Sequence, residues 1–183
     1  GVDIRDIPLD TLMDKVSFVF QDTFLFKQSI MDNIRMGNPD ATEEQVIAAA
    51  KAARCHEFIE QLPNGYQTVI GSTGVHLSGG ERQRIAIARA IVKDAPIIVL
   101  DEATAFSDPE NEYLIQKAFE KLIQKKTVVM IAHRLSTIRN ADQILVMEKG
   151  HLSESGTHDE LLKMGGKYAQ MWSSYTESIN WKI

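Results

Sequence analysis

The sequence has few of the features that mark secreted or membrane-spanning proteins. Its 183 residues include one cysteine, Cys55, so no disulfide can form within the chain, which fits a reducing compartment. We interpret Cys55 as a packed, inert thiol, because it lies in a helical-looking stretch. The longest apolar runs, residues 97–100 and 128–132, have the length of strands, whereas a membrane helix needs roughly 20 residues. The chain also shows no signal-peptide pattern.

An excess of positive charge is missing as well. The formal net charge is −5, which gives no basic face for nucleic acid, so we expect no nucleic-acid partner. Apolar residues make up 44% and charged residues 25% of the chain, which is ordinary for a globular domain with a sizeable core. The first residue is Gly1 rather than Met, which suggests a piece of a longer polypeptide.

Helices and strands are predicted to alternate in the middle of the chain. Residues 79–93 and 109–124 have helical patterns, and each is followed by an apolar strand, at 97–100 and 128–131. Together with a strand at 16–20, this order predicts βαβ units and a parallel sheet. The continuous apolar runs are typical of strands that are buried on both faces.

Residues 28–75 differ, because they are mainly helical and contain no long strand. Thr42 and Gln45 form a capping-box pattern before an apolar helical face, and a short helix is expected at 56–62. We interpret this stretch as a helical subdomain inserted into a sheet-based core.

The C-terminal part is predicted to contain a hairpin, with strands at 144–147 and 152–154, and then helices at 159–163 and 167–175. The expected parts of the chain are the end of an N-terminal core (1–27), the helical subdomain (28–95), the main core (96–176) and a tail (177–183).

A glycine pair opens the helix at residues 79–93. Ser78 and Glu81 form a capping-box pattern around Gly79 and Gly80. A capped helix does not need these glycines, which weaken its first turn. Without side chains, the backbone N–H groups can approach a phosphate, and the helix dipole favours an anion there. The alternative is an ordinary well-capped helix.

Polar residues follow three of the predicted strands. Asp101 and Glu102 come directly after an apolar strand, where the first acid can hold Mg²⁺ and the second can polarise an attacking water. Gln21 and His133 end two further strands. The Gln21 amide can ligate a metal, and the His133 imidazole can donate to a phosphate oxygen. Each of these residues taken alone is also consistent with a solvated strand end.

In order and spacing, these motifs resemble those of the ATP-binding cassette family. Its Q-loop, signature motif, Walker B strand, D-loop and H-loop correspond here to Gln21, residues 77–81, residues 97–102, Asp108 and His133. The resemblance extends from about residue 1 to residue 175. Within the family, the chain is most similar to the exporter-type branch. It implies an α/β fold: a P-loop NTPase-like (RecA-like) core with a mostly parallel sheet and an inserted helical subdomain.

The resemblance also implies an ATPase that uses ATP and Mg²⁺. Glu102 would be the general base or water-polarising residue, and His133 would contact the γ-phosphate. Asp101 and Gln21 would serve Mg²⁺ and the attacking water.

In this family, two cassettes enclose two ATP molecules. Ser78, Gly79 and Gly80 would therefore contact the γ-phosphate of ATP held by a second cassette, and Asp108 would contact across the dimer. Glu81 stands where the family usually has Gln, and it would reach the ribose or the dimer interface. The other expected partner is a transmembrane domain, which residues 24–26 would meet at the cytoplasmic face of the inner membrane.

The chain contains no G-x-x-x-x-G-K-[ST] loop, so the family's Walker A motif and the strand before it are missing. This loop normally surrounds the β- and γ-phosphates. We therefore expect the isolated chain to be inactive, and we expect an exposed sheet edge. Two residues depart from the family pattern. Ala105 replaces the usual first Ser of the D-loop, and Ser72 stands where exporters usually carry Glu, which affects one expected contact with the membrane domain.

Two other functions are compatible with the sequence. One is a soluble cassette ATPase that acts on DNA or ribosomes, which the acidic balance and the exporter-like segments disfavour. The other is a non-catalytic module that only docks on a partner, which the presence of Glu102 and His133 disfavours.

Overall fold

The computed structural model describes residues 1–71, 75–101, 109–132 and 135–180. The chain forms two compact units, Gly1–Ile131 and Ala132–Ile183.

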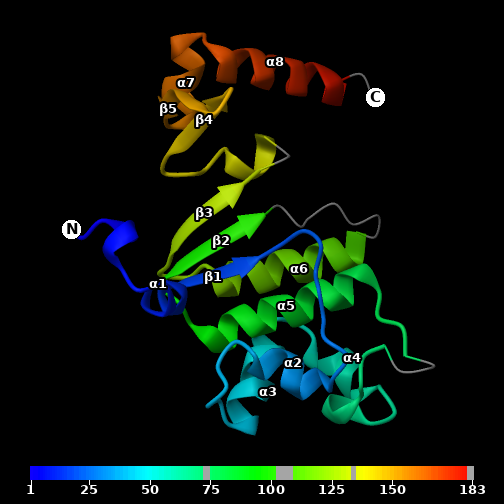
Figure 1. Cartoon of the computed structure of the whole chain (residues 1–183). Helices are drawn as coiled ribbons and strands as arrows, with labels where there is room; N and C mark the ends of the chain where they lie inside the picture. The colour runs from blue at the N-terminus through cyan, green and yellow to red at the C-terminus, as the bar shows by residue number, and fades with distance from the viewer. Residues whose placement is uncertain (72–74, 102–108, 133–134, 181–183) are drawn as a thin grey trace. The chain divides into compact units, whose positions relative to one another are not determined.

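The first unit is built on a three-stranded parallel sheet in the order β1-β2-β3 (Figure 1). These strands span Val16–Val19, Ile97–Asp101 and Thr127–Ile131. Val19 pairs with Leu100, and Leu100 pairs with Met130. The parallel α/β fold predicted from the alternating pattern is therefore confirmed, with strand ends shifted by a residue.

Helices connect these strands and cover one face of the sheet. The 3₁₀ turn η1 (Ile4–Asp6) and helix α1 (Leu9–Lys15) precede β1. Between β1 and β2 lie α2 (Ile30–Arg35), α3 (Glu43–Ala52), α4 (His56–Glu60), the 3₁₀ turn η2 (Gly65–Gln67) and α5 (Gly79–Lys93), and α6 (Pro109–Leu122) joins β2 to β3. The capping box expected at Thr42 and Gln45 is present.

The core of this unit lies between the sheet and the helices. Ile98 and Leu100 point from β2 into a cluster with residues of α2 to α6. Other large and fully buried members include Ile30, Ile34, Ile59, Ile85, Ile87, Ile115 and Leu122. Figure 1 shows α5 and α6 next to the strands and α2 to α4 on the far side of α5.

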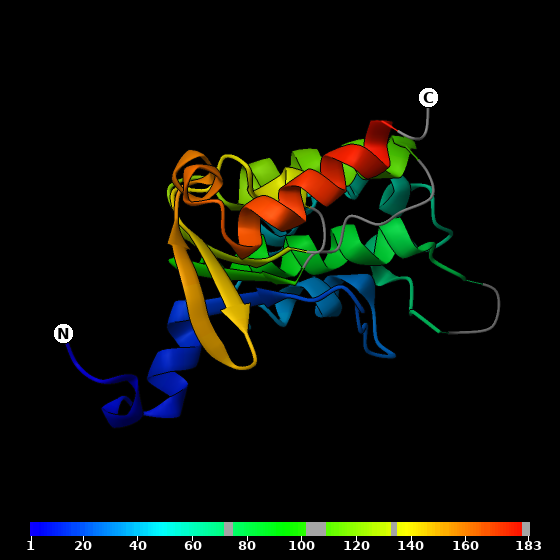
Figure 2. The same ribbon diagram turned by 90° about the horizontal axis from the view of Figure 1, so that it is seen from above.

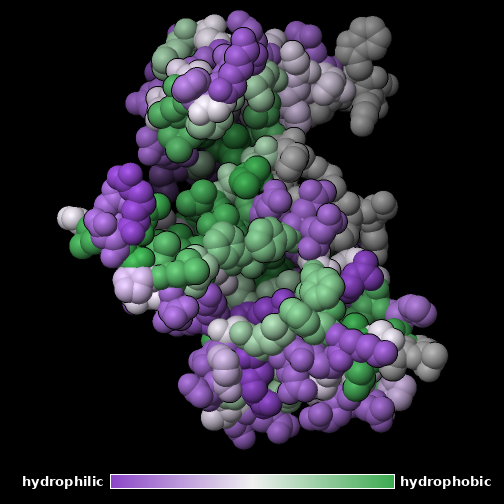
Figure 3. Space-filling view, in the orientation of Figure 1, coloured by the Kyte–Doolittle hydropathy of each residue, from purple (hydrophilic) through white to green (hydrophobic). Residues whose placement is uncertain are grey.

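The opposite face of the sheet is open, so the expectation that both faces are buried is wrong for the described chain. Phe18, Val129 and Ile131 are 42%, 52% and 54% exposed. Both crossovers proceed in the same direction across the sheet, and right-handed crossovers then place their helices on the same face. The space-filling view shows apolar surface gathered over the strands (Figure 3).

The second unit contains the 3₁₀ turn η3 (Leu135–Ile138) and the antiparallel hairpin of β4 (Ile144–Glu148) and β5 (His151–Gly156). Helices α7 (His158–Met164) and α8 (Lys167–Asn180) follow. The hairpin is as predicted. Helix α8 continues past residue 175, where its end was predicted, so residues 176–180 belong to the helix and not to a tail. Ile144, Val146, Leu161 and Tyr168 form this unit's core.

Candidate functional site

The first turn of α5 lies at the same end of the first unit as the carboxyl ends of the strands. Only residues 94–96 separate α5 from β2, so the helix runs back along the sheet in the opposite direction to the strands (Figures 1 and 2). At the other end of α5, Lys93 Nζ donates to the carbonyl of Val16, the first residue of β1, at 2.8 Å. The glycine pair is therefore placed at the edge where ligands bind in open α/β sheets.

The first turn of α5 has the predicted capping box. Ser78 Oγ accepts a hydrogen bond from the Glu81 amide at 3.2 Å, and Glu81 Oε2 accepts one from the Ser78 amide at 2.7 Å. The carboxylate of Glu81 is thus turned back onto its own helix end. The amides of Gly79 and Gly80 donate to no acceptor within the described part of the chain. They are the donors that an anion at this helix end would meet.

Gly80 has a second reason to be glycine. A Cβ atom there would lie 2.8 Å from Asn111 Oδ1 on α6, which is closer than real Cβ atoms approach. Asn111 in turn accepts a hydrogen bond from Arg84 Nη1 at 2.6 Å. Gly80 is buried, whereas Gly79 is half-buried and Ser78 is exposed. Close packing of α6 on α5 therefore accounts for the absence of a side chain at Gly80.

Two oxygen-bearing side chains follow the neighbouring strands at this edge. Val19 of β1 pairs with Leu100 of β2, so the carboxyl ends of the two strands lie side by side. Gln21 follows the end of β1, and Asp101 is the last residue of β2. Gln21 is exposed and Asp101 is half-buried. Within residues 1–71, 75–101, 109–132 and 135–180, no three His, Cys, Asp or Glu residues are grouped to hold a metal. One carboxylate and one amide suit Mg²⁺ that is bound together with phosphate oxygens.

Three of the predicted site residues lie outside the described residues: Glu102, Asp108 and His133. Their predicted roles stay predictions. Of the residues that are described, the fold brings Gln21, Asp101 and the first turn of α5 to one edge of the unit.

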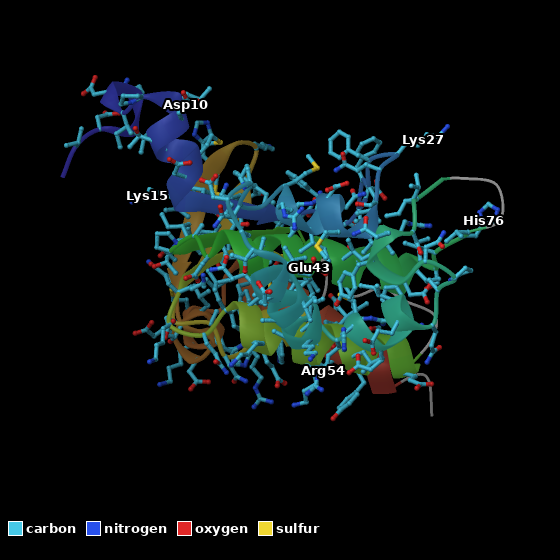
Figure 4. All side chains as sticks on the ribbon, turned by 90° about the horizontal axis from the view of Figure 1, so that it is seen from below. Asp10, Lys15, Lys27, Glu43, Arg54 and His76 are labelled. Atoms are coloured by element: carbon cyan, nitrogen blue, oxygen red, sulfur yellow. The ribbon has the colours of Figure 1, made fainter. Side chains whose placement is uncertain are left out.

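An exposed aromatic pair lies in the segment after β1. Phe24 and Phe26 are 68% and 42% exposed, and their rings meet edge to face with centroids 4.9 Å apart. Lys27, at the end of this segment, projects away from the body of the unit (Figure 4). Exposed aromatic residues that are held together are typical of an interaction surface.

Sequence reasoning assigned no role to three buried polar side chains of α2 and α5. Asn33, Gln83 and Arg84 are 0%, 1% and 4% exposed. Gln83 lies one helical turn before the buried Ile87, so its position on the apolar stripe of α5 was the available signal.

Cys55 is fully buried, as predicted for a packed thiol. Its Sγ donates to the carbonyl of Ala50 at 3.4 Å. Burial raises the pKa of the Cys55 thiol to about 12, and nearby Arg84 offsets this only in part. The thiol therefore stays protonated and unreactive at neutral pH.

Comparison with known proteins identifies the family. The ABC transporter family model matches residues 1–105. The chain belongs to the ABC transporter family. Over 93% of its length it is 55% identical to the ATP-dependent lipid A-core flippase of Chromohalobacter salexigens. Over 95% of its length it is 52% identical to the mycobactin import ATP-binding/permease protein IrtA of Mycolicibacterium thermoresistibile.

A solved structure agrees with this assignment. A bacterial Atm1-family ABC exporter with ATP bound matches 95% of the chain with a TM-score of 0.84 and 44% identity. The chain spans 29% of the flippase, 19% of the import protein and 30% of the solved exporter chain. It therefore corresponds to a part of the ATP-binding domain of exporter-type ABC proteins. In the described ranges, every helix is too short or too polar to cross a membrane.

Proposed function

We propose that this chain supplies the signature helix and the metal-binding strand ends of an ATPase domain in a membrane transporter. One observation carries the proposal: the amides of Gly79 and Gly80, which donate to no acceptor among the described residues, lie at the same edge as Gln21 and Asp101. That edge combines donors for a phosphate with oxygen ligands for Mg²⁺. The relatives are named as ATP-dependent or ATP-binding proteins, which supports ATP as the nucleotide.

The signature end would act on ATP that a second cassette holds. The amides of Gly79 and Gly80 and the hydroxyl hydrogen of Ser78 would donate to its γ-phosphate. The Ser78 oxygen already accepts from the Glu81 amide, and this holds the oxygen in place while its hydrogen can still be donated. The carboxylate of Glu81 serves as a cap, so we assign it the role of shaping this turn.

The strand ends would act on ATP that is bound to the same cassette. Asp101 and Gln21 would hold Mg²⁺, which neutralises phosphate charge when it is bound. The remaining roles rest on the family resemblance: Glu102 polarises the attacking water, His133 donates to the γ-phosphate and Asp108 contacts the second cassette.

ATP turnover would be coupled to transport by a transmembrane domain at the cytoplasmic face of the inner membrane. Phe24 and Phe26 are the surface that we assign to this contact. The names of the relatives include both a flippase and an import protein, so the proposal covers coupling and not the direction or the cargo.

Phosphate release tests this function. In the full-length protein that carries this chain, Glu102→Gln should lower Mg²⁺-dependent ATP hydrolysis by at least about 100-fold, since it removes the water-polarising carboxylate. Glu43→Gln, at the exposed start of α3, should leave turnover unchanged (Figure 4). The 183-residue chain alone, which has no Walker A motif, should show no turnover. Equal activity in Glu102→Gln and the control would contradict the ATPase proposal and favour a non-catalytic docking module.

A further inference from the structure

A buried amide fixes the backbone of the exposed aromatic pair. Asn33 on α2 is fully buried. Its Oδ1 accepts a hydrogen bond from the Phe26 amide at 2.9 Å, and its Nδ2 donates to the Phe26 carbonyl at 3.0 Å. One side chain thus satisfies both backbone groups of Phe26, which leaves this residue little freedom to rotate.

Helix α5 holds that amide in turn. Arg89 Nη2 donates to Asn33 Oδ1 at 3.1 Å, and Arg89 Nε donates to the Asn33 carbonyl at 2.8 Å. Arg89 Nη1 also reaches the carbonyl of Phe24 at 3.4 Å. A single guanidinium on α5 therefore contacts α2 and the aromatic segment together.

The same helix also holds the beginning of the segment. Gln83 accepts a hydrogen bond from the Thr23 hydroxyl and donates to the carbonyl of Phe20 at 3.4 Å. The segment from Phe20 to Phe26 is thus attached to α5 directly at Phe20, Thr23 and Phe24, and through Asn33 at Phe26. The first turn of this helix carries the glycine pair of the candidate ATP site.

We propose that Arg89 and Asn33 are positioning residues that tie the aromatic pair Phe24 and Phe26 to α5, so that a movement of α5 reaches the docking surface. This inference rests on the proposed function, in which ATP closure acts on the first turn of α5. Arg89 is half-buried, and hydrogen bonds from a charged guanidinium to carbonyl groups are among the stronger ones in proteins, so the segment and the helix move as one body.

Amide hydrogen exchange tests the link in the full-length protein that carries this chain. The probe is the Phe26 amide, measured without nucleotide and then with Mg²⁺, ATP and vanadate. In the unchanged protein, its exchange rate should differ between the two states. Arg89→Lys should raise the nucleotide-free rate about tenfold, because lysine cannot make the three contacts together, and it should abolish the difference between the two states.

The matched control is Arg54→Lys, the same chemical change in the helical layer and far from Lys27 (Figure 4). It should keep the nucleotide response. If Arg89→Lys does not fold, Thr23→Val decides, because it removes only the hydroxyl donor to Gln83 from a half-buried loop and should weaken the response. A purely structural role for Arg89 would lower thermal stability and leave the response of the folded protein intact.

Phosphate release, measured in parallel, separates the two proposals. An unchanged protein that does not hydrolyse ATP contradicts the proposed function. A protein that hydrolyses ATP but shows no nucleotide-dependent exchange at Phe26, or shows the full response in folded Arg89→Lys, overturns the link through Arg89 and Asn33.

Discussion

The two faces of the three-stranded sheet have similar apolar composition but different surroundings. On the helical side, Val19 and Ile98 are 1% and 0% exposed and belong to the core of the first unit. On the other side, Phe18, Val129 and Ile131 alternate with them in register and remain largely exposed. The apolar residues of a strand favour burial of both of its faces. The handedness and order of the crossovers decide which of the two faces is buried by helices of this chain.

The largest expected effect is a loss of stability that depends on the face. Val19→Ala should cost about 2 kcal/mol, since it removes two buried methyl groups and leaves a cavity. Val129→Ala, on the other outer strand of the sheet, should cost only about 0.5 kcal/mol because its side chain is 52% exposed. Urea unfolding of both variants measures the two values. Equal losses would mean that the open face is covered in solution.

Much of this comparison could be derived from the sequence, and one part could not. The apolar runs identified the strands, and the Ser78–Glu81 pattern identified the start of α5, because both signals are local. The open face was missed because a strand has the same continuous apolar sequence whether residues of this chain or of another protein segment cover it.

The buried polar contacts behind the candidate site were also hard to predict, because they join residues that are far apart in the sequence. Gln83 contacts the carbonyl of Phe20, 63 residues earlier in the chain, and Arg89 contacts Asn33, 56 residues earlier. Asn111 approaches Gly80 only because α6 packs on α5. These contacts depend on tertiary packing, whereas the strand-end positions of Gln21 and Asp101 follow from the order of elements alone.

An effect of intermediate size is expected on self-association. The exposed Phe18 and Val129 lie on β1 and β3, the two outer strands of the sheet as described, and this apolar surface favours association between copies of the isolated chain. Val129→Lys should weaken this association by roughly tenfold, because a charge on that face has to be desolvated. Sedimentation velocity over a concentration series measures it.

Met164→Lys is the control for this change. Met164 is 62% exposed at the end of α7 in the second unit, so lysine there adds the same charge on a residue that is not part of the three-stranded sheet. It should leave the association unchanged. If both variants shift the equilibrium equally, net charge rather than the open face governs association.

The smallest expected effect concerns the thiol on the covered side. Burial raises the pKa of Cys55 from an ordinary value of 9.0 to about 12. The folded state therefore holds its proton at a pH where the unfolded state has lost it, so this stabilisation is complete below pH 9 and is lost as the pH rises toward 12. Between pH 8 and pH 9.5, the unchanged chain should lose about 1 kcal/mol more stability than Cys55→Ala.

The same thiol can be used to compare the two faces directly. An aromatic disulfide reagent at pH 8 should modify Val129→Cys rapidly on the open face, whereas Cys55 should react only after denaturation, because its thiolate is scarce and its sulfur is fully buried. The separate comparison of stability with Cys55→Ala should stop at pH 9.5, because burial also raises the pKa of Tyr66 and the titration of this tyrosine would add to the effect at higher pH. Rapid modification of Cys55 in the folded chain would show that the helical side opens locally, and the contrast between the two faces would then be one of dynamics as well as of burial.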